Sequence, residues 1–166
     1  MKSKTIKNFF TKKELDNFFF YVFDDEFPWY RGVKVLHSLE KKQHQLRHVF
    51  LTESFGKSFC FDGVAPILDK FLKKTKAKKI VRAKINLTYN SGKSQIGGWH
   101  KDYDDDSDCK VAILYLNTNN GYTKLKDGTK FPSVKNTVVM FDNVEHTDVT
   151  QTNTEERIVL NIGFVA

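Results

Sequence analysis

Residues 81–89 read VRAKINLTY, and they begin a series of short apolar segments that continues through the second half of the chain. The later segments cover residues 97–103, 111–116, 138–141 and 157–165. Turn-forming stretches lie between them, with NSG at residues 90–92, NNG at 119–121 and DG at 127–128. Short apolar segments joined by such turns are typical of an antiparallel sheet. We therefore predict a sheet-rich region from about residue 80 to residue 166.

A first helix is predicted over residues 11–23. Thr11 and Glu14 form the capping-box pattern, in which each side chain accepts a hydrogen bond from a backbone N–H at the helix start. Apolar residues then follow at helical spacing, namely Leu15, Phe18, Phe19 and Val22. These aromatic side chains are interpreted as core.

A second helix is predicted from about Asp62, a candidate N-cap, to about residue 74, with Pro66 in its first turns. Between the two helices, residues 29–59 alternate loosely between apolar and polar side chains, which predicts strands. Helices followed by a run of strands indicate an α+β protein.

The strands of the second half are expected to form a double-stranded β-helix, or jelly roll, with the N-terminal helices supporting it. Two stacked antiparallel sheets would protect the strand edges and leave a cavity between the sheets. The chain has 166 residues, which is enough for one domain with its own core. We expect a single domain, with helical and strand support over residues 1–79 and the jelly-roll core over residues 80–166.

Composition excludes several classes of protein. The two cysteines show no paired spacing, and no stretch of about 18 uncharged apolar residues is present, so a disulfide framework and a membrane partner are not expected. The N-terminus lacks the pattern of a signal peptide, and a cytoplasmic protein of bacterial or phage origin is expected. The net charge is +7, and the basic run over residues 70–84 is interpreted as a solvated surface.

His100 and Asp102 are two residues apart, so on an extended segment both side chains would leave from the same face. His146 would have to reach them from a distant strand. Two imidazoles and one carboxylate can bind a metal on one face and leave other positions open, as in non-haem Fe(II) oxygenases. Asp104 is a second candidate for the carboxylate.

The order of these segments resembles the Fe(II)/2-oxoglutarate-dependent dioxygenase superfamily, and within it the prolyl-4-hydroxylase-like branch. The resemblance covers residues 80–166 and rests on five motifs in order: INLTY at 85–89, WHKD at 99–102, ILYLN at 113–117, VVMF at 138–141 followed by His146, and Arg157 on the last apolar segment. A His-x-Asp pair alone is common by chance. The complete ordered set is much more specific.

The resemblance implies a role for each of these residues. His100, Asp102 and His146 would be catalytic metal ligands, and Arg157 would bind the distal carboxylate of 2-oxoglutarate. A guanidinium suits that role because its planar fork makes two charge-assisted hydrogen bonds to a carboxylate. Relatives also use a phenol to bind the cosubstrate, and this places two tyrosines as candidates, Tyr89 and Tyr115.

The activity that the resemblance implies is hydroxylation of a C–H bond, coupled to the decarboxylation of 2-oxoglutarate to succinate. The favoured substrate is a prolyl residue in a peptide or protein. The implied cofactors are Fe(II), 2-oxoglutarate as cosubstrate and O2, with ascorbate as a further candidate.

One motif departs from the prolyl hydroxylases. Relatives commonly have Gly-Gly-x-Thr after the Tyr-Leu-Asn segment, whereas residues 120–123 read NGYT here. This departure bears on the substrate more than on the reaction class. An AlkB-type nucleic-acid demethylase is an alternative, suggested by residues 86–89 preceding residues 96–100 and by the positive charge. The acidic residues at 102–108 and the lack of a second arginine after Arg157 argue against it. A jelly-roll binding module without catalysis is the non-enzyme alternative.

Overall fold

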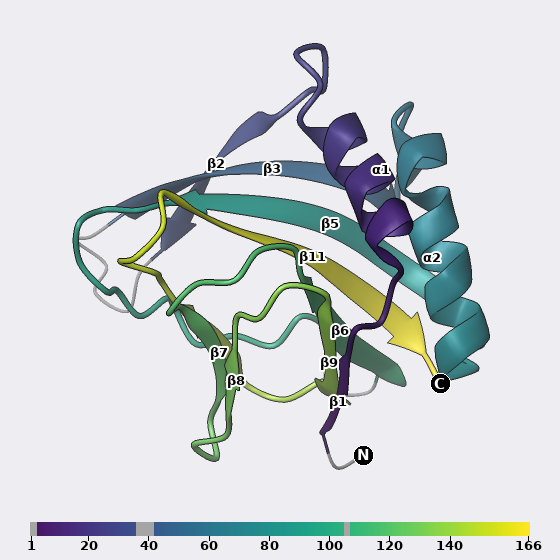
Figure 1. Ribbon diagram of the computed structural model, residues 1–166. Helices are drawn as coiled ribbons and strands as arrows, with labels where there is room; N and C mark the ends of the chain where they lie inside the picture. The colour runs from purple at the N-terminus through teal and green to yellow at the C-terminus, as the bar shows by residue number, and fades with distance from the viewer. Residues whose placement is uncertain (1–2, 36–41, 105–106) are drawn as a thin grey trace.

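The structure is a computed structural model that describes residues 3–35, 42–104 and 107–166 (Figure 1). In chain order its elements are β1 (Lys4–Lys7), α1 (Lys12–Val22), β2 (Tyr30–Val35), β3 (Lys42–Thr52), β4 (Gly56–Lys57), α2 (Phe61–Thr75), β5 (Lys79–Tyr89), β6 (Cys109–Tyr115), β7 (Tyr122–Leu125), β8 (Lys130–Pro132), β9 (Thr137–Asp142), β10 (His146–Val149) and β11 (Glu156–Val165). Within the described residues, no helix is long and apolar enough to cross a membrane.

The strands form two antiparallel sheets. The large sheet has the order β1-β9-β6-β11-β5-β3-β2, with β4 paired to β3, and the small sheet has the order β10-β7-β8. Helices α1 and α2 cover one face of the large sheet, and the small sheet lies on the other side (Figure 1). This arrangement confirms the predicted α+β jelly roll with supporting N-terminal helices. The N-terminal half also contributes β1, β2, β3 and β4 to the large sheet.

Both faces of the large sheet are buried. Successive side chains of its central strands point to opposite faces, and each face is covered by other elements. Ala83, Ile85 and Leu87 of β5 pack toward the helices, in a core that also contains Val64 and Phe71 of α2. Alternate residues of a strand point to opposite faces, so the even-numbered residues of β5 point toward the small sheet. A second apolar cluster lies between the two sheets and includes Val111, Ile113, Tyr115, Leu125, Phe131, Val139, Phe141 and Val159.

The sequence-based elements differ from the structure at several places. Strands β1, β7, β8 and β10 were not predicted. Residues 36–41, inside the region 29–59 that was predicted to form strands, lie outside the described residues. Asp62 does not cap α2, because Cys60 occupies the N-cap position and makes no side-chain cap hydrogen bond. The segment predicted over residues 97–103 is not a continuous strand, and the bridges near it are isolated, at Ile96 and His100. The basic run is not wholly a solvated surface, because the side chain of Arg82 is only 20% exposed.

Helix α1 begins as predicted, with Thr11 as N-cap and both hydrogen bonds of the capping box present. Glu14 accepts a hydrogen bond from Lys70 of α2 as well as from the backbone N–H of Thr11. These contacts lower the pKa of Glu14 to about 2, with the hydrogen bond from Lys70 as the largest cause. One carboxylate thus caps α1 and ties it to α2.

Because the pKa of Glu14 is lower in the folded than in the unfolded protein, its contribution to stability is present above about pH 4.5 and is lost as the pH falls toward 2. We expect Glu14→Gln to be less stable than the wild type at pH 6, and the two stabilities to converge toward pH 2. Thermal unfolding of both proteins across this range measures the difference. A difference that does not change with pH would contradict the assignment.

Candidate active site

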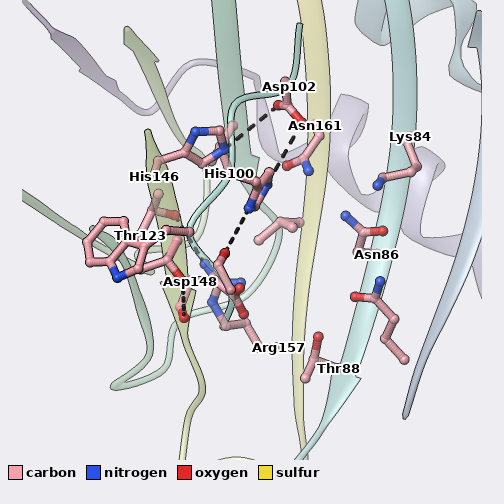
Figure 2. A pocket seen from close by; sticks show the side chains of 16 residues that line it. Lys84, Asn86, Thr88, His100, Asp102, Thr123, His146, Asp148, Arg157 and Asn161 are labelled. Atoms are coloured by element: carbon pink, nitrogen blue, oxygen red, sulfur yellow. Dashed lines mark hydrogen bonds and ion pairs between the residues drawn. The ribbon is translucent and has the colours of Figure 1, made fainter. Parts of the chain in front are cut away.

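A cavity with a volume of about 430 Å³ lies between the two sheets (Figure 2). Side chains from both sheets and from the segment before β6 line it, namely Gln45, Lys84, Asn86, Thr88, Trp99, His100, Asp102, Ile113, Thr123, His146, Thr147, Asp148, Arg157, Val159 and Asn161, together with Gly98. Such a cavity between jelly-roll sheets is a suitable place for a small ligand.

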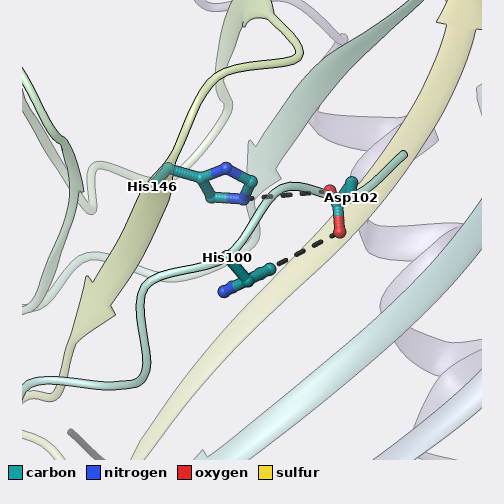
Figure 3. Close-up of side chains that lie close together, drawn as sticks. All are labelled: His100, Asp102 and His146. Carbon is teal, nitrogen blue, oxygen red and sulfur yellow. Dashed lines mark ion pairs between the residues drawn. The ribbon is translucent and has the colours of Figure 1, made fainter. Parts of the chain in front are cut away.

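His100, Asp102 and His146 line this cavity (Figure 2) and lie close together (Figure 3). Each offers one ligand atom, and the three atoms lie within 4.8 Å of one another. His146 is the first residue of β10, and two backbone hydrogen bonds hold His100 beside it. The distance from His100 N to His146 O is 3.1 Å, and that from His146 N to His100 O is 3.0 Å. The two imidazole centroids are 4.6 Å apart. The backbone thus brings together the two histidines that are distant in sequence.

Both histidines have Nε2 on the side of Asp102. Nδ1 of His100 lies 2.9 Å from the carbonyl oxygen of Gly98, and Nδ1 of His146 lies 2.9 Å from that of Val144. Because a carbonyl only accepts hydrogen bonds, each Nδ1 carries the proton in the neutral ring, and each Nε2 keeps a lone pair. In metal sites, a hydrogen bond of this type from the ring nitrogen that does not bind the metal orients the histidine.

The Nε2 atoms do not form hydrogen bonds with Asp102. Nε2 of His146 is 3.8 Å from Asp102 Oδ2, and Nε2 of His100 is 4.0 Å from Oδ1, both too long for a hydrogen bond. His146 is only 5% exposed, and burial lowers its pKa, although hydrogen bonding to Val144 and the charge of Asp102 oppose this. The histidine is therefore neutral near pH 7, which is the form that binds a metal.

Asp102 uses one carboxylate oxygen and leaves the other unpartnered. Oδ1 forms an ion pair with Nη2 of Arg82 at 2.7 Å, whereas Oδ2 is buried and has no hydrogen-bond partner in the described structure. Burial alone would raise the pKa of Asp102, but the charge of Arg82 and its hydrogen bond lower it, and His146 and His100 add to this lowering when they are protonated. An ionised, buried oxygen without a partner is costly. A cation between Oδ2 and the two Nε2 atoms would provide its missing contact, so these residues fit a metal.

Arg157 of β11 lies in the same cavity and is only 4% exposed. Its Nε donates to Ser133 Oγ at 3.0 Å, and Nη2 donates to Thr123 Oγ1 at 3.3 Å. Burial lowers its pKa, and the neighbouring Tyr115 phenol opposes this shift. Neutral hydroxyl groups orient the guanidinium but do not neutralise it, so the site fits an anion.

The two candidate tyrosines differ in position. Tyr115 is fully buried behind Arg157, with the guanidinium 5.7 Å from its ring centroid. Its hydroxyl lies 2.8 Å from Thr123 Oγ1 and donates to the carbonyl oxygen of Phe131 at 3.0 Å. Tyr89, at the end of β5, is 49% exposed and is not among the described residues that line the cavity. Asp104 is exposed and lies outside the group formed by His100, Asp102 and His146.

Several polar residues that line the cavity were not among the site residues predicted from the sequence. Lys84, Asn86 and Thr88 are alternate residues of β5, and Asn161 lies opposite Lys84 on β11. The signal was present in the sequence, because polar residues alternate strictly with apolar ones from residue 81 to residue 88. A strand that is buried on both faces needs a reason to keep polar side chains, and the cavity is that reason.

No family model matches the sequence, and no curated protein is similar to it in sequence. Solved structures are similar in fold. An oxidoreductase of the 2OG-Fe(II) oxygenase family from Burkholderia pseudomallei matches with a TM-score of 0.72 at 12% identity, covering 98% of this chain and 84% of that one. A prolyl-4-hydroxylase from Pseudomonas putida matches with a TM-score of 0.65 at 14% identity, covering 98% and 91% of the two chains.

A third structure is a prolyl hydroxylase from Trichoplax adhaerens, in complex with a hypoxia inducible factor oxygen degradation domain peptide fragment. It matches with a TM-score of 0.66 at 10% identity, covering 98% of this chain and 83% of that one. All three matches extend beyond the region that carries the sequence motifs and include the N-terminal helices and strands. The chain therefore has the fold of the 2OG-Fe(II) oxygenases and prolyl hydroxylases.

Proposed function

We propose that this protein is an Fe(II)- and 2-oxoglutarate-dependent dioxygenase that hydroxylates a C–H bond. The observation that carries the proposal is the meeting of a His-Asp-His group and a buried arginine in one cavity. The group has the ligand types of non-haem Fe(II) oxygenases, and the arginine supplies an anion site beside it. Neither feature alone would specify this chemistry.

Each residue has a defined part in the proposal. His100, Asp102 and His146 would hold Fe(II), and Arg157 would bind the distal carboxylate of 2-oxoglutarate. When bound, the iron and 2-oxoglutarate supply oxidation by O2, in which one oxygen atom enters the substrate and the other enters succinate as CO2 is lost. Ser133 and Thr123 orient the guanidinium through their hydroxyl groups. Tyr115 positions Thr123 from behind and completes this hydrogen-bonded group.

The proposed substrate is a prolyl residue in a peptide or protein. Its support is the likeness in fold to two prolyl hydroxylases, one of which was solved with a peptide fragment. O2 is the oxidant, and ascorbate is proposed as the reductant that keeps the iron in its Fe(II) state. The assay with the wild-type protein, Fe(II), 2-oxoglutarate and proline-containing peptides should yield succinate and peptides heavier by one oxygen atom. Loss of a methyl group from an oligonucleotide instead would support the demethylase alternative.

Metal binding should depend on the carboxylate of Asp102. Asp102→Asn keeps the size of the side chain but removes its charge, and we expect the affinity for Co(II), a spectroscopic substitute for Fe(II), to fall at least about 100-fold. Titration followed by the absorption of bound Co(II) measures this. Asp108→Asn is the matched control, because it makes the same change at an exposed position of the same segment. Equal affinities in the two variants would contradict the assignment.

His100→Ala should abolish iron-dependent turnover of 2-oxoglutarate, because it removes one of the three proposed ligands. Succinate formation measured against added Fe(II) tests this expectation. Normal iron-dependent turnover in the variant would overturn the ligand assignment.

Recognition of 2-oxoglutarate should depend on the fork of Arg157. Arg157→Lys retains a positive charge but cannot make two parallel hydrogen bonds, and we expect the KM for 2-oxoglutarate to rise about tenfold to 100-fold. Co(II) affinity in the same variant serves as the control, because Arg157 is not a proposed ligand. An unchanged KM would mean that the cosubstrate binds elsewhere.

A further inference from the structure

A row of polar side chains lines the wall of the cavity that the large sheet provides. Lys84, Asn86 and Thr88 come from β5, Asn161 is the register partner of Lys84 on β11, and Gln45 is the register partner of Thr88 on β3. Figure 2 shows Lys84 and Asn86 pointing into the cavity beyond Asn161, on the side away from His146. This wall is not used by the metal ligands or by Arg157.

Lys84 carries a positive charge that lacks a close partner. In the parts of the chain that the structure describes, its ammonium takes part in no hydrogen bond and no ion pair. Burial lowers its pKa, and the charges of Arg82 and Arg47 add to this effect, whereas Asp102 opposes it. Asp102, however, is already paired with Arg82 at 2.7 Å. Positive charge therefore exceeds negative charge on this wall, which favours an anionic ligand.

The side-chain amide oxygens next to Lys84 accept no hydrogen bond within the described structure. Asn86 is only 8% exposed, and its Oδ1 has no partner within the described structure. The same holds for Oδ1 of Asn161, the cross-strand neighbour of Lys84. A buried acceptor without a partner costs free energy, which a ligand with N–H groups would recover. The complementary ligand thus combines an anionic group with N–H donors.

The cosubstrate cannot fill this place while it is bound to Arg157. Arg157 is the register partner of Thr88 and Asn161 is that of Lys84, so the backbone positions that carry the two cations are four residues apart along the strands, or roughly 13 Å. The carboxyl carbons of a five-carbon diacid are joined by four C–C bonds and lie roughly 5 Å apart. In Figure 2, Arg157 lies below the His-Asp-His group, and Lys84 lies to its side. The wall at Lys84 is left for a different ligand.

We propose that Lys84, with Asn86 and Asn161, binds an acidic side chain and a neighbouring backbone N–H of a peptide substrate. This inference rests on the proposed function and specifies its substrate as a peptide with Asp or Glu close to the residue that is oxidised. Lys84 would be a residue that determines specificity, because it touches the substrate away from the reacting C–H bond. A peptide supplies both the carboxylate and the N–H donors that this wall lacks.

The test uses the full chain with Fe(II) and 2-oxoglutarate, and three peptides that differ only in Glu, Gln or Lys beside a central proline. For the wild type, we expect kcat/KM for oxygen incorporation to be about tenfold or more higher with the Glu peptide than with the Gln peptide. Lys84→Met should remove this preference, Lys84→Arg should retain it, and Lys84→Glu should favour the Lys peptide. Lys13→Met, at an exposed position of α1, is the matched control and should keep the wild-type preference.

Each outcome supports or overturns the inference. Equal kcat/KM for the three peptides, oxidation of N-acetylglutamate but of no peptide, or a Glu preference that survives in Lys84→Met would overturn it. Thermal unfolding shows whether each variant folds. If Lys84→Met does not fold, the peptide preferences of Lys84→Glu and Lys84→Arg test the inference. A wild-type protein that forms no iron-dependent succinate would refute the proposed function itself. Succinate formation without a charge preference would refute only the role of Lys84.

Discussion

The pairing of β5 with β11 is the constraint on which the cavity and the core both depend. The two strands lie at the centre of the large sheet and remain paired over almost their full length, with one register shift between Gly163 and Phe164. Because side chains alternate between faces, this pairing sends Ile85 and Leu160 toward the helices and Lys84 and Arg157 toward the cavity. A slip of one residue would exchange the two faces and bury charges against the helices.

The same pairing fixes the carboxylate of the proposed metal site. Arg82 of β5 forms the ion pair with Asp102, and its guanidinium lies 5.2 Å from the ring centroid of Tyr103. The Tyr103 hydroxyl reaches β11 at Gly163, where a Cβ would lie 1.6 Å from the hydroxyl oxygen. Gly163 is therefore required by this close approach. Through these contacts the two central strands hold the segment that carries Asp102 and leave Oδ2 facing His146.

The charges of the lining side chains divide the cavity into regions that suit different ligands. The His-Asp-His group offers a single carboxylate and two neutral imidazoles, which suits a cation. Arg157 and Lys84 lie at the two ends of the sheet wall. Arg157 donates to the neutral hydroxyl groups of Ser133 and Thr123, and Asp102, the carboxylate whose charge acts on Lys84, is paired with Arg82. Two separate anionic groups would offset the charges of Arg157 and Lys84, and a cation would contact the unpartnered oxygen of Asp102. One arrangement of side chains thus suits the proposed metal, the cosubstrate and an acidic substrate.

The sequence by itself determined the local elements and the order of the chemical groups. The capping box of Thr11 and Glu14 defined the start of α1, because that pattern satisfies backbone groups locally. The ordered motifs indicated the jelly roll and brought out the two histidines, Asp102 and Arg157 as candidates, because the spacing of these groups along the chain follows from the order of the strands.

Only the tertiary structure decided which of these groups meet and what surrounds them. The bridge between His100 and His146 joins residues from separate segments, and no local pattern reports such a contact. In the structure, Tyr89 is exposed and is not among the described residues that line the cavity, whereas Lys84 lines it. A lysine within a basic run looks the same in sequence whether it faces water or a cavity. Its environment depends on which sheet packs over the strand, and long-range packing alone fixes that.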